Sequence, residues 1–291
     1  MKYQYPSEIN FKKETGGISA CYKDGSKIKY NLDIWAINYL LNEGLYQDNR
    51  DNIVHLHATD TTMALRLCLL QKFQLFKNIV FDVANAGYFK ETIEDILNDN
   101  SKKYITYSTD FLPRGKKRTQ EALIEQHLSE DLSRLSEKEF TKSKKSITQF
   151  PANIFKVKIS EENRVTRKFW IDILSVNNSK QLSVIELKAG ENCPLDILIQ
   201  AIDYGIYCHL FKKHIADCFF NNVPSLDKNK IAIYCVAEKF HPGLMGRNEI
   251  KGILSLFQQN NFFDLILFKI GTTSGKIDSD PVTVVYDSRL R

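Results

Sequence analysis

Two consecutive apolar segments, each interrupted by acidic residues, constrain the fold of this chain more than any other feature. The segments are FWIDILS (169–175) and LSVIELKAG (182–190), and a turn-prone NNSK sequence separates them. In strands, alternation places Asp172 on one face of the first segment and Glu186 with Lys188 on one face of the second. Because an unpaired carboxylate is costly to bury among apolar side chains, the pattern predicts a hairpin that presents two carboxylates and a lysine together.

These residue types suit a magnesium or manganese site. A hard divalent cation takes oxygen ligands, usually one or two carboxylates together with water and substrate phosphate. Asp172, Glu186 and the backbone carbonyl of Leu187 are predicted to supply such oxygens. A bound cation lowers the pKa of its water and stabilises charge on a phosphoryl group under attack. Lys188 is placed to orient or deprotonate the attacking water, since lysine shifts its pKa readily in confined sites.

Helices that carry further polar residues flank the hairpin in the sequence. Apolar residues recur at helical spacing over Thr119–Leu135 and predict a helix on which Glu121 and Glu125 share a face. A second helix is predicted from Pro194 to about Lys213. Gln200 and Tyr204 are four residues apart in it and therefore lie on one side.

The order of these elements resembles the PD-(D/E)XK nuclease superfamily. Asp172 matches the aspartate of the motif, although it follows isoleucine rather than proline, while Glu186 matches the (D/E) position and Lys188 the lysine. The segment Gln200-Ala-Ile-Asp-Tyr204 looks like the Q-x-x-x-Y signature of the exonuclease and recombination-repair branch. The resemblance covers roughly residues 114–270.

The resemblance implies a restriction-endonuclease-like α/β core. Its elements follow one another along the chain as α-β-β-β-α-β, and the strands form a mixed sheet flanked by helices. The resemblance further implies that one of Glu121 and Glu125 contacts the metal, directly or through water. The sequence slightly favours Glu121 but does not settle the choice. Gln200 would help hold the active-site lysine or the substrate, and Tyr204 would approach the nucleic-acid backbone. The implied activity is hydrolysis of phosphodiester bonds, most readily in DNA, in a defence, repair or mobile-element setting.

The chain is expected to form two domains. An N-terminal α/β region (1–112) precedes a nuclease domain (113–291), with a break where Pro113, Gly115 and the first basic cluster coincide. The further helices predicted are Leu32–Asn42, Met63–Phe76 after an Asp60 cap, Lys90–Asn98 and Asn248–Gln259. The strands predicted are Asn52–His57, Asn78–Val83, Lys103–Ser108, Ile154–Ile159, Lys168–Val176, Gln181–Lys188, Lys230–Val236 and Phe263–Ile270.

Basic residues cluster on both sides of the predicted core. The net charge of +5 does not by itself identify a nucleic-acid binder, but phosphate backbones attract lysine and arginine. The first candidates for phosphate contacts are Arg114, Lys116, Lys117, Arg118, Arg167 and Lys168.

Several classes of protein are not favoured by the sequence. It contains no P-loop motif, and its six cysteines form no C-x-x-C pair, so neither an attached ATPase nor structural zinc is expected. Apolar runs are too short for a bilayer span, and we expect a cytoplasmic protein without a membrane partner.

Two questions stay open at this point. The nuclease fold also occurs as a binding or assembly module with weak or lost catalysis, and the N-terminal region is a candidate for mediating homo-oligomer formation. The sequence does not decide DNA against RNA, strandedness, sequence specificity, or exonuclease against endonuclease action.

Overall fold

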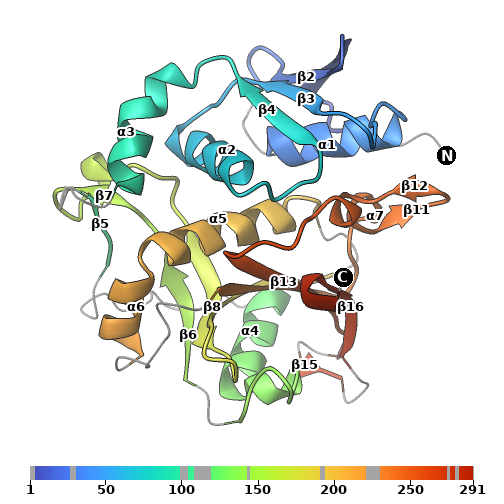
Figure 1. Cartoon of the computed structure of the whole chain (residues 1–291). Coiled ribbons are helices and arrows are strands. Elements are labelled where there is room, and N and C mark those ends of the chain that lie inside the picture. The colour runs from blue at the N-terminus through green and yellow to red at the C-terminus, as the bar shows by residue number, and fades with distance from the viewer. Residues whose placement is uncertain are drawn as a thin grey trace. The chain divides into compact units, whose positions relative to one another are not determined.

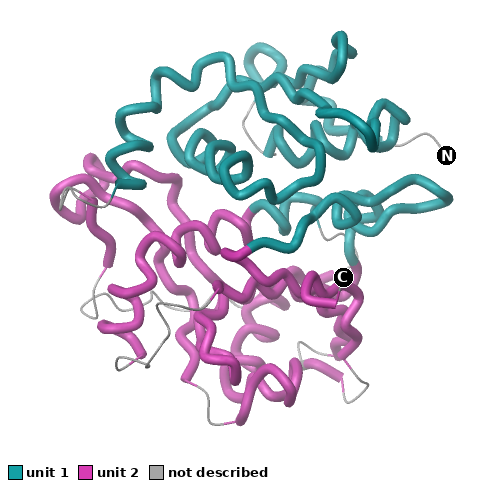
Figure 2. The backbone as a smooth tube through the Cα atoms, viewed as in Figure 1, with its two compact units in different colours: residues 1–98, 194–199, 240–260 teal, residues 99–193, 200–239, 261–291 magenta. Residues whose placement is uncertain are grey.

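The computed structural model shows a mixed α/β protein with two compact units (Figures 1 and 2). Unit 1 comprises residues 1–98, 194–199 and 240–260, and unit 2 comprises residues 99–193, 200–239 and 261–291. The two units are therefore interleaved along the chain, and the predicted boundary at 112–113 lies outside the described residues. The structure describes residues 4–26, 31–98, 104–107, 119–142, 145–190, 194–220, 230–273, 276–278 and 282–290.

Unit 1 contains a sheet of order β1-β2-β3-β4. Strand β1 (Ile9–Glu14) pairs antiparallel with β2 (Gly17–Tyr22), and β2, β3 (Asn52–Leu56) and β4 (Ile79–Val83) are parallel. Helix α1 (Leu32–Asn42) connects β2 to β3, helix α2 (Thr61–Lys72) connects β3 to β4, and α3 (Gly87–Leu97) follows. The predicted helix Leu32–Asn42 is confirmed, and so is the Asp60 cap, whose carboxylate accepts from the Met63 amide at 2.9 Å. The hairpin β1–β2 is absent from the sequence prediction.

A buried polar network explains why residues 194–199 belong to unit 1. The carboxylate of Asp196 accepts hydrogen bonds from the backbone and side chain of Asn31 and from the indole of Trp35 at 2.6–3.0 Å. Nearby, the fully buried Arg66 donates to Asp33 at 2.7 Å. Such groups are tolerated inside a protein only when their hydrogen bonds are made, so the network fixes this segment against α1.

The helix predicted near Asn248–Gln259 is wrong. A short helix α7 (Pro242–Met245) and strand β11 (Gly246–Arg247) precede that stretch, which itself contains the partner strand β12 (Ile250–Lys251) and a 3₁₀ turn at Ile253–Ser255. The turn residues Asn248 and Glu249 have φ of 47° and 68°, the left-handed conformation that two-residue hairpin turns require. Gly252 lies so close to the backbone of residue 246 that a Cβ would meet its amide nitrogen at 2.2 Å.

Unit 2 is built on a mixed sheet of order β16-β13-β10-β9-β8-β6. Strands β9, β10 and β13 are parallel, whereas β8, β6 and β16 pair antiparallel with their neighbours. The helices are α4 (Gln120–Glu130), α5 (Ile197–Leu210), which belongs to unit 2 from Gln200 onward, and α6 (Lys212–Phe219). The sheet strands are β6 (Ser146–Pro151), β8 (Trp170–Val176), β9 (Leu182–Lys188), β10 (Ile231–Ala237), β13 (Phe263–Lys269) and β16 (Thr283–Asp287). Short pairs form between β5 (Tyr104–Ile105) and β7 (Phe155–Lys156), and between β14 (Thr272–Thr273) and β15 (Lys276–Ile277).

The two faces of this sheet have different covers. Ile124 and Leu128 of α4 form one buried cluster with Ile173 and Ile185. On the other face, a Cβ added to Gly205 of α5 would lie 2.6 Å from the side chain of Ile233 and 3.1 Å from that of Phe263. Because side chains alternate along a strand, Asp172 and Glu186 point to the α5 face.

The first strand of this sheet differs from the prediction. The strand expected at Ile154–Ile159 is wrong, since only Phe155–Lys156 pairs there, and the strand that joins the sheet is β6. The lysines that precede β6 in the sequence, and Pro151 at its end, do not favour a strand there. However, β6 lies at the edge of the sheet, where a proline costs no ladder hydrogen bond.

The helix predicted at Thr119–Leu135 also ends early. Asp131 adopts φ of −157° and caps a 3₁₀ turn at Leu132–Arg134. Among the described residues we find no helix with the length and apolarity that a bilayer crossing requires.

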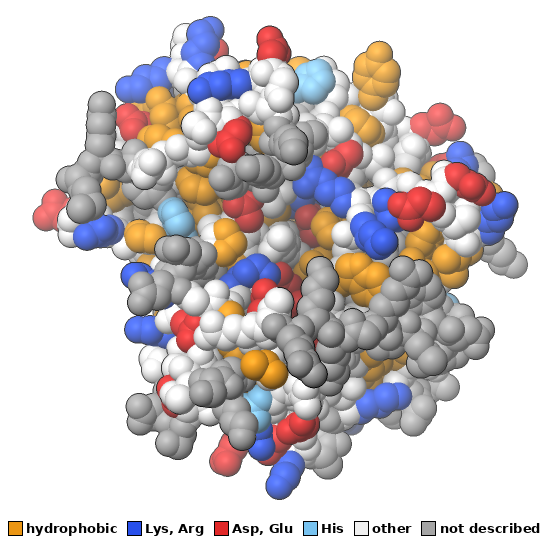
Figure 3. Space-filling model, turned by 180° about the vertical axis from the view of Figure 1, so that it is seen from behind, with side chains coloured by type: hydrophobic (Ala, Val, Ile, Leu, Met, Phe, Trp, Pro, Cys, Tyr) orange, Lys and Arg blue, Asp and Glu red, His pale blue; other side chains and the backbone are white. Residues whose placement is uncertain are grey.

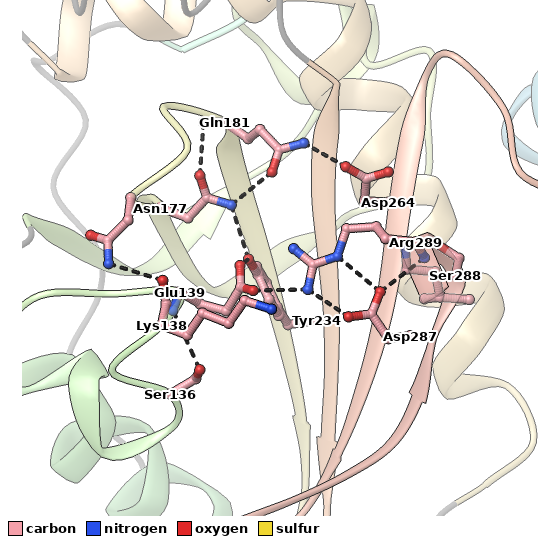
Figure 4. A network of polar contacts seen from close by, with 12 residues as sticks. Ser136, Lys138, Glu139, Asn177, Gln181, Tyr234, Asp264, Asp287, Ser288 and Arg289 are labelled. Atoms are coloured by element: carbon pink, nitrogen blue, oxygen red, sulfur yellow. Dashed lines mark hydrogen bonds and ion pairs between the residues drawn. The ribbon is translucent and has the colours of Figure 1, made fainter. Parts of the chain in front are cut away.

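Polar side chains close the end of the sheet opposite the acidic residues (Figure 4). Glu139, which is 5% exposed, accepts from the hydroxyl of Tyr234 and from the guanidinium of Arg289, each at 2.8 Å. Arg289 also binds Asp287 at 2.6 Å, and Asn177 donates to the Tyr234 hydroxyl at 3.0 Å. The network ties the C-terminal residues to the central strand β10.

Replacing Arg289 by alanine would leave the buried Glu139 carboxylate without its cation. We expect the free energy of unfolding to fall by about 1–3 kcal/mol, the cost of an unsatisfied buried acceptor. Urea denaturation measures this change. The control is Arg164→Ala, because Arg164 pairs with Glu161, whose side chain is 74% exposed, and such pairs contribute about 1 kcal/mol or less. Equal losses in the two variants would contradict the expectation.

Candidate active site

The structure brings Asp172, Glu186 and Lys188 together at one end of the β8–β9 hairpin. One oxygen of Asp172 accepts from the backbone amide of Leu187 at 2.8 Å. The ammonium of Lys188 donates to Glu186 Oε1 at 2.7 Å and to the backbone carbonyl of Leu187 at 2.9 Å. The lysine is therefore bound by two of the oxygens that the sequence predicts as metal ligands.

Helix α4 separates the roles of its two glutamates. The Thr119 hydroxyl caps the helix by accepting from the Ala122 amide at 3.2 Å, which places Glu121 in the first turn. Glu121 Oε1 accepts from Lys188 at 3.1 Å, and its side chain is 37% exposed. Glu125 lies one turn further on, is 6% exposed, and accepts from the Gln149 amide at 2.6 Å. Glu121 is thus the helix glutamate that contacts the lysine.

The site concentrates negative charge in a buried place. Burial raises the pKa of Glu186 well above 4.5, and the adjacent Asp172 carboxylate raises it further. Burial also raises the pKa of Asp172. Burial by itself lowers the pKa of Lys188, but the carboxylates of Glu186, Asp172 and Glu121 outweigh it, so the net shift is upward. Lys188 is consequently an ammonium. The raised pKa values of Asp172 and Glu186 mean that burial favours the protonated form of each carboxyl group.

One buried acceptor atom of the site, Glu186 Oε2, has no hydrogen-bond partner within the described part of the chain, and Gln200 Oε1 on α5 is a second such atom. Buried acceptors of this kind normally have a partner in the protein, a water or an ion, and a carboxylate oxygen is a preferred ligand of a hard cation. Asp172, Glu186 and Glu121 are carboxylates of the kind that coordinates magnesium or manganese. As the side chains stand, no group of three or more His, Cys, Asp or Glu residues in the described ranges is arranged to hold a metal.

Helix α5 brings Tyr204, the tyrosine of its Gln-x-x-x-Tyr segment, close to the same carboxylates. Tyr204 is 6% exposed, and its ring meets that of Phe169 edge-on at 5.5 Å. Burial raises the pKa of Tyr204 well above 10.0, and the charges of Glu186 and Asp172 contribute. The tyrosine therefore lies within the acidic cluster, with little surface of its own to offer to a nucleic-acid backbone.

Two residues that support the site, Gln149 and Glu238, are absent from the sequence prediction. Gln149 joins Glu125 to Asp172, as described below. Glu238, just after β10, accepts from the backbone amide of Gly190 and from the hydroxyl of Thr272. These bonds fix the exit of strand β9 immediately after Lys188. The pairing of Lys188 with Ala237 in the β9–β10 register explains the placement of Glu238, but that register is not readable from local sequence.

The predicted phosphate-binding residues divide into two groups. Arg114, Lys116, Lys117 and Arg118 lie outside the described residues. Arg167 is half-buried and Lys168 is exposed, and both directly precede strand β8. On the face drawn in Figure 3, lysine and arginine side chains are interspersed with aspartate and glutamate.

Comparison with known proteins adds no relative to this picture. No family model matches the chain, and neither a curated protein nor a solved structure matches it significantly.

Removing the Glu186 charge is expected to stabilise the metal-free protein. The pKa of Glu186 is raised above its unfolded value of 4.5 in the fold, so the folded state binds the proton of this carboxyl more tightly than the unfolded state does. The stability that this proton contributes is fully present below pH 4.5 and is lost as the pH rises through the folded pKa. The variant Glu186→Gln keeps a neutral side chain at every pH. We expect a gain on the order of 1 kcal/mol above the folded pKa, as when charge strain at a functional site is relieved.

Denaturation of metal-free protein at a series of pH values, with chelator present, measures this effect. The matched control is Glu130→Gln, on the exposed side of α4, which should leave the pH profile unchanged. A Glu186→Gln variant that loses stability at neutral pH would contradict the assignment of charge strain to this carboxylate.

Proposed function

We propose that this protein is a metal-dependent nuclease that hydrolyses phosphodiester bonds, with DNA as its substrate. The observation that carries the proposal is the buried carboxylate pair Asp172 and Glu186 beside Lys188, with Glu186 Oε2 lacking a partner among the described residues. The single ammonium of Lys188 neutralises only part of the charge of this acidic pair, and the remaining buried charge is costly. A divalent cation would offset that charge and bind the unpartnered oxygen. Clusters of strongly perturbed groups occur preferentially at functional sites.

The order of elements in unit 2 supports the same proposal. Leaving aside the short strand β7, the 3₁₀ turns and the additional helix α6 after α5, the elements α4, β6, β8, β9, α5 and β10 follow one another as α-β-β-β-α-β. This is the order expected of the PD-(D/E)XK superfamily, and the acidic residues and lysine lie on the elements that the motif requires. Membership of that superfamily is part of the proposal.

Each side chain has a distinct role in the proposed reaction. When bound, the cation would lower the pKa of a water molecule and stabilise charge on the scissile phosphate. Asp172, Glu186, Glu121 and the carbonyl of Leu187 would hold it. Lys188, with its raised pKa, would act as an ammonium that orients the attacking water and stabilises negative charge. A role as general base would require its neighbouring carboxylates to be neutralised first, since they are what keep it protonated.

A second candidate function is nucleic-acid binding or assembly without cleavage. The contacts of Lys188 with Glu186, Glu121 and the Leu187 carbonyl favour it, because a lysine bound by these oxygens neutralises part of their charge. Cation binding discriminates the two functions: a nuclease must exchange some of these lysine contacts for metal contacts, whereas a binding module has no need to.

Cleavage assays test the proposal directly. The substrates are labelled linear, circular and single-stranded DNA and an RNA of the same sequence, each in Mg²⁺, in Mn²⁺ and with chelator. We expect metal-dependent cleavage that falls by roughly a hundredfold or more in Asp172→Ala and Lys188→Ala, as for the loss of other groups that stabilise developing charge. Glu121→Gln should also reduce the rate, and Glu130→Gln on the same helix should not. Cleavage that is unchanged in Asp172→Ala and Lys188→Ala would contradict the proposal, and binding without cleavage by the unmodified chain would favour the second function.

A further inference from the structure

Gln149 has a backbone conformation that a strand residue rarely adopts. It lies within edge strand β6, yet its φ is 50°, in the left-handed region that disfavours residues with a side chain. The β6–β8 register is intact on both sides, with Thr148 opposite Ile173 and Phe150 opposite Ile171. Gln149 therefore lies opposite Asp172, and the strain is confined to this one residue.

The side-chain amide of Gln149 connects a helix to a strand. Its nitrogen donates to Glu125 Oε2 on α4 at 2.6 Å and to Asp172 Oδ1 on β8 at 3.4 Å. A carboxamide nitrogen carries two hydrogens, so both bonds can be made at once. Since the other oxygen of Asp172 accepts from the Leu187 amide, the two contacts together define the orientation of the Asp172 carboxylate.

We propose that Gln149 is a positioning residue that orients Asp172 for cation binding and is held in a strained conformation for that purpose. The inference rests on the proposed function. A regular strand φ would redirect the side chain, so the left-handed conformation is what keeps the amide between the two carboxylates. Strained residues persist where the surrounding structure over-determines them, often at functional sites, and the partners that orient metal ligands control metal affinity.

The same contacts assign Glu125 a different role from Glu121. Glu125 is buried and accepts from Gln149, whereas Glu121 is partly exposed and contacts Lys188. Glu125 therefore anchors the amide that orients Asp172, and Glu121 remains the helix carboxylate that faces the cation.

Two variants of Gln149 and one control separate positioning from strain. Gln149→Gly removes the amide and relieves the left-handed backbone, whereas Gln149→Met keeps the side-chain length and the strain but removes the hydrogen bonds. The control is Gln74→Gly, because Gln74 is the same residue type with φ of 48°, and it is exposed in unit 1. For each protein, calorimetric titration measures the Mn²⁺ dissociation constant, and thermal unfolding of the metal-free chain measures Tm.

We expect both Gln149 variants to bind Mn²⁺ about tenfold to a hundredfold more weakly, the usual effect of removing a residue that orients a metal ligand. Tm should be equal or higher in Gln74→Gly, since glycine adopts this φ without strain, and this control should bind Mn²⁺ normally. Both Gln149 variants lose the donor to the buried Glu125 carboxylate, so relief of the backbone should show as a higher Tm in Gln149→Gly than in Gln149→Met. If Gln149→Gly does not fold, the methionine variant decides by the same criterion.

Two negative results have different meanings. Equal Mn²⁺ affinity in the unmodified chain and in the folded Gln149 variants would overturn the positioning role and leave the proposed nuclease function intact. Absence of Mn²⁺ binding in the unmodified chain would overturn the metal-dependent function itself, and the positioning role with it.

Discussion

The ion pair between Lys188 and Glu186 is the interaction on which the candidate site depends. The Glu186 side chain is 3% exposed and that of Lys188 is 20% exposed, and their closest atoms are 2.7 Å apart. Taking such charges out of water costs several kcal/mol per ion in real proteins, and attraction between them offsets this cost only when the geometry is good. Here Lys188 also reaches Glu121 and a backbone carbonyl, so one ammonium serves three oxygens. Without it, the buried carboxylates would repel one another unopposed.

Favourable packing and polar pairing in the remainder of unit 2 offset the free-energy cost of burying this acidic cluster. A continuous apolar core joins α4 to Ile173, Ile185 and Leu187 on one face of the sheet, and α5 covers the other face so closely that position 205 requires glycine. At the opposite end of the sheet, the network around Glu139 and Arg289 is well paired. Among the described residues of unit 2, the unpartnered Glu186 Oε2 and the left-handed Gln149 both lie at the acidic end. These two features are the physical basis of the proposed function and of the role assigned to Gln149.

The central part of the site was accessible from sequence because its signals are local. Alternation within two short strands put Asp172, Glu186 and Lys188 on one side, and helical spacing brought Gln200 and Tyr204 to a common face. Only the structure shows how these side chains meet. The sequence left Glu121 and Glu125 as alternatives because both occupy one helical face, and the choice depends on which strand each meets. Similarly, the edge strand β6 and the hairpin at Gly246–Lys251 depend on pairing partners and on left-handed backbone positions, which composition does not reveal.

By itself, the sequence determined the mixed α/β class, the hairpin that carries the acidic residues, and the three residues around which the site is built. These follow from periodicity and from the cost of placing carboxylates in apolar strands, both of which act over a few residues. Tertiary structure alone decided that unit 1 and unit 2 interleave along the chain, that Tyr204 is buried, and that Gln149 links Glu125 to Asp172. Those outcomes depend on strand register and on close packing between distant segments. Register and packing are set by the whole core at once, because a shift of one residue in any strand would turn every side chain of that strand to the other face.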